Sequence, residues 1–368
     1  VTVDGIRESD PAFALLESGC IDYIVYTGAL KDATTDDYIA LHRRALQLGI
    51  PCFTSLDTAN ALADIIASRY NEHNTELVDI NHMRTKRQRL KFSKMQATGD
   101  DYIYVENFDG HITCPESLCI PLCSRHRGIG GYGIVLIERS AVADAKMRVF
   151  NRDGSPGGIG GNAIRCVGKY LYDNGMTDGR TTITIDTLSG VKTLELTVKD
   201  GKMQSARVDM GAAILAPREI PVDMDGESVI SAPIVVDEKV YHMTCVSMGN
   251  PHCVIFQKED VDDLDLTRIG PKFEHHPLFP ERVNTEFVNV LPDGSLKMRV
   301  WERGSGETWA CGTGSCATGV AACLNGFANK NEDIVVHLRG GDLTIRYTDE
   351  TVFMTGAATT VFKGEIEI

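Results

Sequence analysis

Residues 301–317 read WERGSGETWACGTGSCA, which predicts a strand end, a glycine-rich loop and the first turns of a small-residue helix. The loop delivers Cys311 to the start of that helix. A thiol at a helix N-terminus lies near the positive end of the helix dipole, which favours the thiolate, and the free N–H groups there can hold a carboxylate. Two interpretations are open at this point: a reactive cysteine beside a bound acid, or a buried structural cysteine in a tight turn.

An internal repeat relates this stretch to an earlier one. The sequence MRVFNR at residues 147–152 matches MRVWER at residues 298–303, which is a shift of 151 in residue number. The same shift pairs Gly161 with Gly312, and the Asn-Gly helix stop at 174–175 with the one at 325–326. Three matches in one register indicate a duplicated unit of strand, loop and helix.

The repeat also has two interpretations. A duplication can be retained for packing alone, or it can build two related halves whose helix N-termini point into one cleft. In such a cleft the helix N-termini can hold the carboxylate of an amino acid. Two thiols on opposite faces of the α-carbon can then remove and return a proton, which inverts that centre without a cofactor.

One thiol of such a pair is missing from this sequence. The residue that the repeat pairs with Cys311 is Gly160. Cys166 is the nearest cysteine, but it lies inside the predicted helix and pairs with Ala317. The repeat therefore assigns no catalytic role to Cys166.

The composition limits the classes of protein that fit. A chain of 368 residues with 43% hydrophobic residues is long enough for two or three compact units. A net charge of −14 argues against a general nucleic-acid binder, and no apolar run or leader pattern suggests a membrane span or a signal peptide. Eleven scattered cysteines, without paired CxxC motifs, argue against a zinc knuckle and a complete disulfide framework, so we expect a cytoplasmic protein. The first residue is Val1 rather than Met, which fits a fragment or a processed product.

The character of the chain changes near residue 90. Residues 1–70 alternate between predicted strands (21–26 and 51–56) and predicted helices (36–48 and 58–69), which suggests a parallel sheet. Residues 71–89 are a polar and then basic linker. From residue 90 onward short strands with turn signals dominate, which predicts an α+β fold with sheets wrapped around few helices.

The first 70 residues contain four short motifs, DYIV, RRA, GIP and LDTA, at residues 22–25, 43–45, 49–51 and 56–59. In these motifs the segment resembles the C-terminal half of the methylglyoxal-synthase-like domain that ends the large chain of carbamoyl-phosphate synthase. The first half of such a domain is absent. We therefore expect a partial α/β domain with no catalytic role of its own.

A series of short motifs runs through residues 90–368: FSKM (92–95), RH and GIG (125–126 and 128–130), GNAIRC (161–166), SMGNPHC (247–253), RVN (282–284), ERG (302–304), ET (307–308) and ACGTG (310–314). In these motifs the segment resembles diaminopimelate epimerase, a cofactor-independent enzyme of lysine and peptidoglycan precursor synthesis. The resemblance implies two pseudo-symmetric halves with curved sheets around central helices. They would span residues 90–208, completed by 356–368, and residues 209–355. It also implies a homodimer and an amino-acid substrate, with no metal, nucleic-acid or membrane partner.

The resemblance implies roles for particular residues. Cys311 matches one of the two catalytic cysteines of the family, and His252 lies in a motif close to the chemistry. The expected substrate-binding residues include the helix starts that grip the reacting α-carboxylate. The full set is Asp100, Asn151, Gly161, Asn162, Asn250, Asn284, Glu302, Arg303, Gly312 and Thr313.

The sequence departs from the family pattern at four positions. Gly160 stands in place of the second catalytic cysteine, Pro156 in place of an acidic residue, Tyr132 in place of an aspartate, and Asp100 in place of a substrate-contacting asparagine. An aspartate there should weaken carboxylate binding, and the loss of one thiol removes a general acid–base group. We therefore expect impaired epimerisation. A non-catalytic amino-acid-binding module and a racemase of another amino acid are the alternatives.

Overall fold

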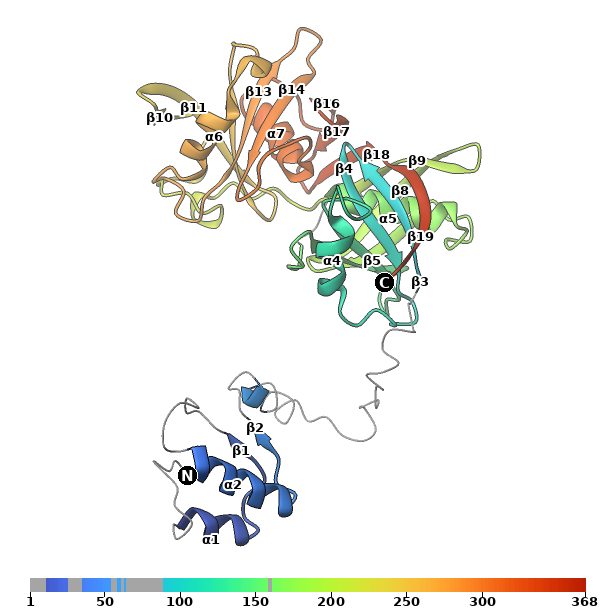
Figure 1. The fold of residues 1–368 in the computed structure, drawn as a ribbon. Helices are drawn as coiled ribbons and strands as arrows, with labels where there is room; N and C mark the ends of the chain where they lie inside the picture. Colours follow the sequence, from blue (N-terminus) through green and yellow to red (C-terminus); the bar gives the residue numbers. More distant parts are fainter. Residues whose placement is uncertain (1–10, 26–34, 54–57, 61–62, 64–88, 158–160) are drawn as a thin grey trace. The chain divides into compact units, whose positions relative to one another are not determined.

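The structure, a computed structural model, describes residues 11–25, 35–53, 58–60, 63, 89–157 and 161–368 (Figure 1). The chain forms two compact units, Val1–Lys86 and Arg87–Ile368. Among the described residues, no helix is both long and apolar enough to cross a membrane.

The N-terminal unit contains four described elements: α1 (Pro11–Glu17), β1 (Ile24–Val25), α2 (Thr35–Gln47) and β2 (Cys52–Phe53). β1 and β2 pair in parallel. A small core of Leu16, Leu41, Ala45 and Ile50 holds the helices together. Most of the predicted helix at residues 58–69 lies outside the described residues, and the relation of this unit to the synthase domain stays a prediction.

The second unit has two halves, visible in Figure 1 as a cyan-to-green lobe and a yellow-to-orange lobe. The first half contains β3 (Arg89–Ala97), β4 (Asp100–Glu106), α4 (Pro115–Cys123), β5 (Gly133–Glu138), β6 (Ala145–Asn151), α5 (Gly161–Asp173), β7 (Thr182–Thr187), β8 (Gly190–Lys199) and β9 (Lys202–Asp209).

The second half repeats this order of elements. It contains β10 (Ala232–Val236), β11 (Lys239–Ser247), β12 (Pro251–Phe256), α6 (Leu266–Glu274), β13 (Asn284–Val290), β14 (Leu296–Glu302), β15 (Gly306–Thr308), α7 (Gly312–Leu324), β16 (Asp333–Leu338), β17 (Gly341–Tyr347) and β18 (Val352–Ala357). The last strand, β19 (Thr359–Glu367), pairs with β3 and so returns to the first half. β18 pairs with β9 and joins the two halves.

Strand pairing confirms the repeat that the sequence predicts. From β3 to β9 the neighbouring strands pair antiparallel, parallel, antiparallel, parallel and twice more antiparallel. The series from β11 to β18 has the same pattern, with β16 in the place of β7. Ala145 pairs with Ile185, and Leu296 pairs with Val336, so the shift of 151 holds for the register as well.

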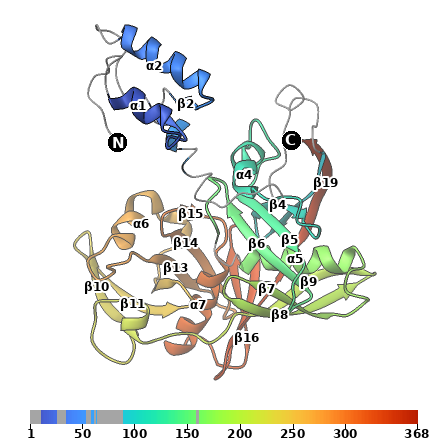
Figure 2. The same cartoon turned by 90° about the horizontal axis from the view of Figure 1, so that it is seen from below.

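The helices α5 and α7 form the centre of each half (Figure 2). Both helices contain 13 residues, and their first residues, Gly161 and Gly312, are related by the same shift of 151. α7 carries no charged residue and is buried along almost its whole length, as expected for a helix enclosed by strands. The second unit consists mostly of strands, with few helices, and is divided into two halves. This fold confirms the α+β architecture expected from the sequence. The exact domain boundaries stay a prediction.

A close helix–sheet contact recurs at equivalent positions of the two halves. A Cβ on Gly168 would lie 2.9 Å from Leu194 Cδ2, and a Cβ on Gly319 would lie 2.6 Å from Ile345 Cγ2. Both pairs follow the shift of 151. The absent side chains therefore let each helix approach its sheet.

We predict that Gly319→Ala lowers the free energy of unfolding by about 1–3 kcal/mol, because overpacking outweighs the helix propensity gained from alanine. Urea unfolding measures the effect. The matched control is Gly319→Ala combined with Ile345→Ala, in which truncation of Ile345 should cost less than it does in the wild-type background. Strict additivity, or a Gly319→Ala protein more stable than the wild type, would contradict the prediction.

Candidate functional site

A cleft of ≈ 590 Å³ lies where the N-termini of α5 and α7 meet. Its described lining comes from both halves of the second unit. It brings together nine of the residues expected from the sequence: Asp100, Asn151, Gly161, Asn162, Asn250, Glu302, Cys311, Gly312 and Thr313. Both helix starts are therefore part of one hollow, as the repeat suggests.

The two helix N-termini approach each other across Met354 of β18. A Cβ on Gly161 would lie 3.0 Å from Met354 Cε, and a Cβ on Gly312 would lie 3.2 Å from Met354 Sδ. A larger residue at either position would require the Met354 side chain to move. The free N–H groups of the two helix starts and the positive ends of both dipoles thus share one cleft, which favours an anionic group there.

Cys311 is the N-cap residue of α7. Its backbone is extended (φ −129°, ψ 111°), and its Sγ accepts a hydrogen bond from the Gly314 N–H at 3.3 Å. The Thr313 hydroxyl lies 3.5 Å from the same sulfur. The predicted position of this thiol at a helix start is confirmed.

The predicted preference of Cys311 for the thiolate does not hold in this structure. Burial raises the pKa of the Cys311 thiol well above its ordinary value, and the charges of Glu302 and Glu286 raise it further. The hydrogen bonds from Thr313 and Gly314 lower it, but by less. The resting side chain is therefore a thiol, because desolvation and two carboxylates outweigh the helix N-terminus.

Asp100 lies at the start of β4 and accepts a hydrogen bond from Asn162 Nδ2 at 2.7 Å. Burial raises the pKa of this carboxyl to about 6, even though the Asn162 hydrogen bond and the charge of Arg165 lower it. Arg165 is fully buried and donates to Thr98 Oγ1 at 3.1 Å, so it supports the same loop from behind. Asp100 is thus a carboxyl that can hold a proton at mildly acidic pH.

Glu302 is the second carboxyl in the cleft. The Thr308 hydroxyl donates a hydrogen bond to Glu302 Oε1. Burial raises the pKa of Glu302 to about 7, and the charge of Asp100 contributes in the same direction. Since the charge of Glu302 also acts on Cys311, the thiol and both carboxyls belong to one electrostatic unit.

Two residues expected at the site do not line the cleft. Asn284 Oδ1 accepts from the Arg303 backbone N–H at 2.8 Å, and Asn284 Nδ2 donates to the Pro251 carbonyl at 2.9 Å. The Arg303 guanidinium donates to the Glu281 carbonyl at 3.0 Å. These side chains hold neighbouring loops in this structure, and their contact with a substrate stays a prediction.

Sequence reasoning missed several residues of the site. Tyr102, Ser189 and Lys192 line the cleft, and Lys192 is the sole cation among its described lining residues. It also missed Glu286, a fully buried carboxyl that pairs with His252. Strand alternation could have flagged Glu286, since it follows Asn284 at a spacing of two, whereas no local pattern marks Lys192.

Of the four departures from the family pattern, Asp100 is the one placed in the cleft among the described positions. Tyr132 is 39% exposed and packs under Arg125, whose Cζ lies 5.3 Å from the ring centre. Pro156 forms an isolated bridge with Phe150. Gly160 lies outside the described residues.

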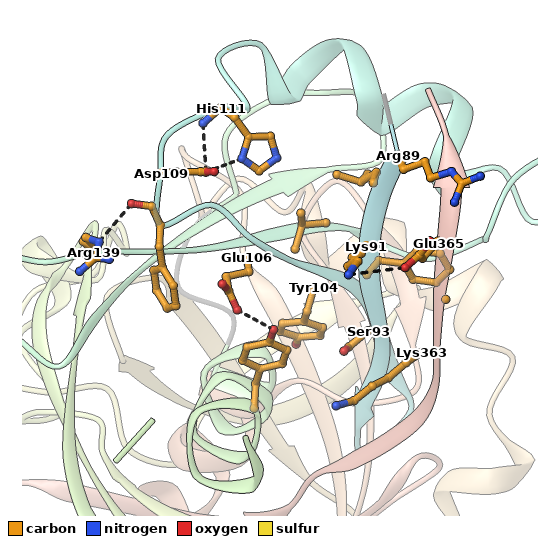
Figure 3. Close-up of a pocket in the computed structure, with 16 residues that line it drawn as sticks. Arg89, Lys91, Ser93, Tyr104, Glu106, Asp109, His111, Arg139, Lys363 and Glu365 are labelled. Carbon is orange, nitrogen blue, oxygen red and sulfur yellow. Dashed lines mark hydrogen bonds and ion pairs between the residues drawn. The ribbon is translucent and has the colours of Figure 1, made fainter. Parts of the chain in front are cut away.

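A second hollow, of ≈ 750 Å³, lies over β3, β4 and β19 of the first half (Figure 3). Several of its polar groups pair with one another: Tyr170 donates to Glu106 at 3.0 Å, and Lys91 lies 3.7 Å from Glu365. None of its described lining residues is a cysteine or a predicted site residue. The cleft at the helix starts is therefore the candidate active site. In the part of the chain that the structure describes, no group of three or more His, Cys, Asp and Glu could hold a metal ion.

Solved structures with the same architecture are epimerases, racemases and related proteins. A hydroxyproline epimerase from Agrobacterium vitis superposes with a TM-score of 0.59 at 15% identity, covering 78% of this chain and 94% of that chain. A phenazine biosynthesis protein of the PhzF family from Bacillus anthracis gives a TM-score of 0.55 at 15% identity, covering 76% and 100%. At these identities the likeness concerns the fold alone.

Sequence comparison is more specific. A sequence model described as diaminopimelate epimerase matches residues 92–216 and 244–361. The diaminopimelate epimerase of Acetivibrio thermocellus is 51% identical over 281 residues, which is 76% of this chain and 99% of the relative. That of Agathobacter rectalis is 50% identical over 288 residues, with coverage of 76% and 100%.

The sequence match and the relatives of about 50% identity define an isomerase of the epimerase type. The N-terminal unit contributes nothing to this assignment, because the matches begin at residue 92. The chain belongs to the diaminopimelate epimerase family.

We predict that Asp100→Asn changes the pH dependence of stability. The folded-state pKa of Asp100 is raised from 3.8 to about 6, so the folded protein binds this proton more tightly than the unfolded chain. Stability from this group is present below pH 4 and is lost as the pH rises to 6. The variant should avoid that loss and gain about 1–3 kcal/mol relative to the wild type between pH 4 and pH 8.

Urea unfolding at several pH values measures this difference. The amide can still accept the hydrogen bond from Asn162, so packing is retained. Parallel stability curves for the two proteins would contradict the prediction.

Proposed function

We propose that the cleft binds diaminopimelate and that Cys311 moves the proton of its α-carbon on one face. The observation that carries the proposal is the meeting of two helix N-termini and one capping thiol in a single cleft. Relatives about 50% identical, named diaminopimelate epimerases, support the choice of substrate.

Each part of the cleft has a role in this proposal. The N–H groups at Gly161–Asn162 and Gly312–Thr313 hold the reacting α-carboxylate. Asn151 and Asn250 offer amides to the polar groups of the substrate, and Lys192 supplies a cation. The helix dipoles and these donors stabilise the negative charge that develops when the α-proton leaves.

Cys311 must lose its own proton before it can act as a base. Glu302, with a pKa of about 7, is partly ionised at neutral pH and its charge already acts on the thiol. It can take the thiol proton once the positive ammonium group of a substrate offsets the new thiolate charge. The thiolate then removes the α-proton, the thiol so formed exchanges its proton with solvent, and Cys311 delivers a solvent-derived proton to the same face.

Inversion needs a second acid–base group on the opposite face, and Gly160 supplies none. We therefore propose that epimerisation of L,L- to meso-diaminopimelate is reduced by about 10²–10⁴-fold relative to a two-thiol enzyme, while exchange of the α-proton persists. Asp100 weakens carboxylate binding as well. In the family context the protein would act without a cofactor in lysine and peptidoglycan precursor synthesis, as a cytoplasmic homodimer.

Incubation with L,L-diaminopimelate in deuterated water tests this function. We expect α-deuteration by mass spectrometry with little meso product. Both signals at the rate of a two-thiol enzyme would refute the impairment. Binding by calorimetry without deuteration would favour a non-catalytic binding module, which Gly160 and Asp100 make the second candidate. Turnover of another amino acid alone would favour a racemase.

We predict that Gly160→Cys increases the rate of meso-diaminopimelate formation by at least about tenfold, since it restores an acid–base group on the second face. The matched control is Gly160→Ser, which adds a similar volume without a thiol. The initial rate of meso product formation is the readout. Equal rates for both variants would show that Asp100, Pro156 or Tyr132 is the deeper defect.

A further inference from the structure

His252 and Glu286 form a buried pair beneath the cleft. They lie on the neighbouring parallel strands β12 and β13, and both side chains are fully buried. His252 Nδ1 lies 2.7 Å from Glu286 Oε1. Glu286 Oε2 has no hydrogen-bond partner among the described residues. A carboxyl buried in this way is costly unless its charge is compensated.

The second ring nitrogen of His252 faces another acceptor. His252 Nε2 lies 3.0 Å from Asn250 Oδ1. An imidazole nitrogen that faces a carboxylate or an amide oxygen must carry a hydrogen, and here both nitrogens do. The contacts therefore describe an imidazolium, whose charge is offset by Glu286.

This arrangement determines what Asn250 offers to the cleft. Because Asn250 Oδ1 accepts from His252, the oxygen is directed away from a ligand and the Nδ2 amino group remains available. Asn250 lines the cleft, and the structure gives its Nδ2 no other protein partner within the described residues. The amide is thus prepared as a donor, the polarity that a carboxylate requires.

The pair is also close to the reacting thiol. A Cβ on Gly314 would lie 2.5 Å from Glu286 Oε1 and 3.2 Å from Cys311 Sγ. The carboxylate and the thiol are therefore both close to Gly314 in the first turn of α7. The charged and titratable groups that face the pair are Glu302, Cys311 and the buried thiol of Cys253, whose pKa the charge of Glu286 also raises. The charge of His252 lowers the pKa of Glu302, and that of Glu286 raises the pKa of Cys311.

We propose that Glu286 is a positioning residue: through the His252 imidazolium it holds the amide of Asn250 with its NH₂ group toward the cleft, where it donates to a substrate carboxylate. The inference rests on the proposed function, because it assumes that the cleft binds a carboxylate. It adds Glu286, which lies outside the cleft, as the residue whose charge determines whether Asn250 donates or accepts a hydrogen bond inside the cleft.

Glu286→Gln removes the charge while keeping the shape. In the variant no carboxylate offsets the charge of an imidazolium, so one ring nitrogen becomes an acceptor and the Asn250 amide is no longer held in one orientation. We expect the Kd for diaminopimelate to rise about tenfold relative to the wild type.

Calorimetry measures this ratio. Glu286→Asp retains the charge and should recover part of the affinity. The control is Glu138→Gln, which removes a carboxylate that pairs with Arg148 in the first half, and its Kd should stay near that of the wild type. A Glu286→Asp variant that binds as weakly as Glu286→Gln would mean a structural role and overturn the proposal.

A second measurement does not depend on activity or on the folding of a variant. In wild-type protein labelled with ¹⁵N-histidine, both ring nitrogens of His252 should give imidazolium signals at pH 8, assigned by their loss in His252→Gln. A neutral imidazole at pH 8 overturns the inference. If wild-type protein shows the imidazolium but binds no diaminopimelate, the proposed function fails, whereas the charged His252–Glu286 pair is still supported.

Discussion

The close approach of two helix starts to one methionine is the constraint on which the active-site cleft depends. Met354 belongs to β18, the strand that joins the halves through β9. The end of its side chain lies 3.0 Å and 3.2 Å from the positions that Cβ atoms on Gly161 and Gly312 would occupy. The strand that joins the two halves therefore also packs against both helix N-termini.

This geometry concentrates opposing electrostatic effects in a small volume. Two helix dipoles and several amides favour an anion, whereas Asp100, Glu302 and Cys311 are buried groups for which ionisation is costly. Burial therefore raises the pKa values of the two carboxyls, Asp100 and Glu302, to about 6 and 7. A substrate that brings both an ammonium and a carboxylate can satisfy both sets of groups at once, which is a physical reason for selecting an amino acid.

The sequence predicted the helices and strands around Cys311 well because the repeat showed the same pattern of strand, loop and helix at two places in the chain. Its shift of 151 residues holds for the helix starts, for the β6 and β14 registers and for the glycine–sheet contacts. It predicted the ionisation of Cys311 poorly. A helix N-terminus can be recognised from the local sequence. The pKa of Cys311, however, also depends on burial and on the charges of Glu286 and Glu302, which the folded strands β13 and β14 bring close to the thiol.

The amino-acid sequence alone was sufficient for the family, the two-halved plan and nine of the residues that line the cleft, because motifs and periodicity are local and survive in order along the chain. The tertiary structure alone decided which neighbours each polar group meets. Asn284 and Arg303 hold loops rather than lining the cleft, Lys192 enters it from β8, and Glu286 reaches the site through His252. Solvent exclusion and charge proximity depend on distances in space, so the protonation states of Cys311, Asp100 and Glu302 follow from the fold and not from the order of residues.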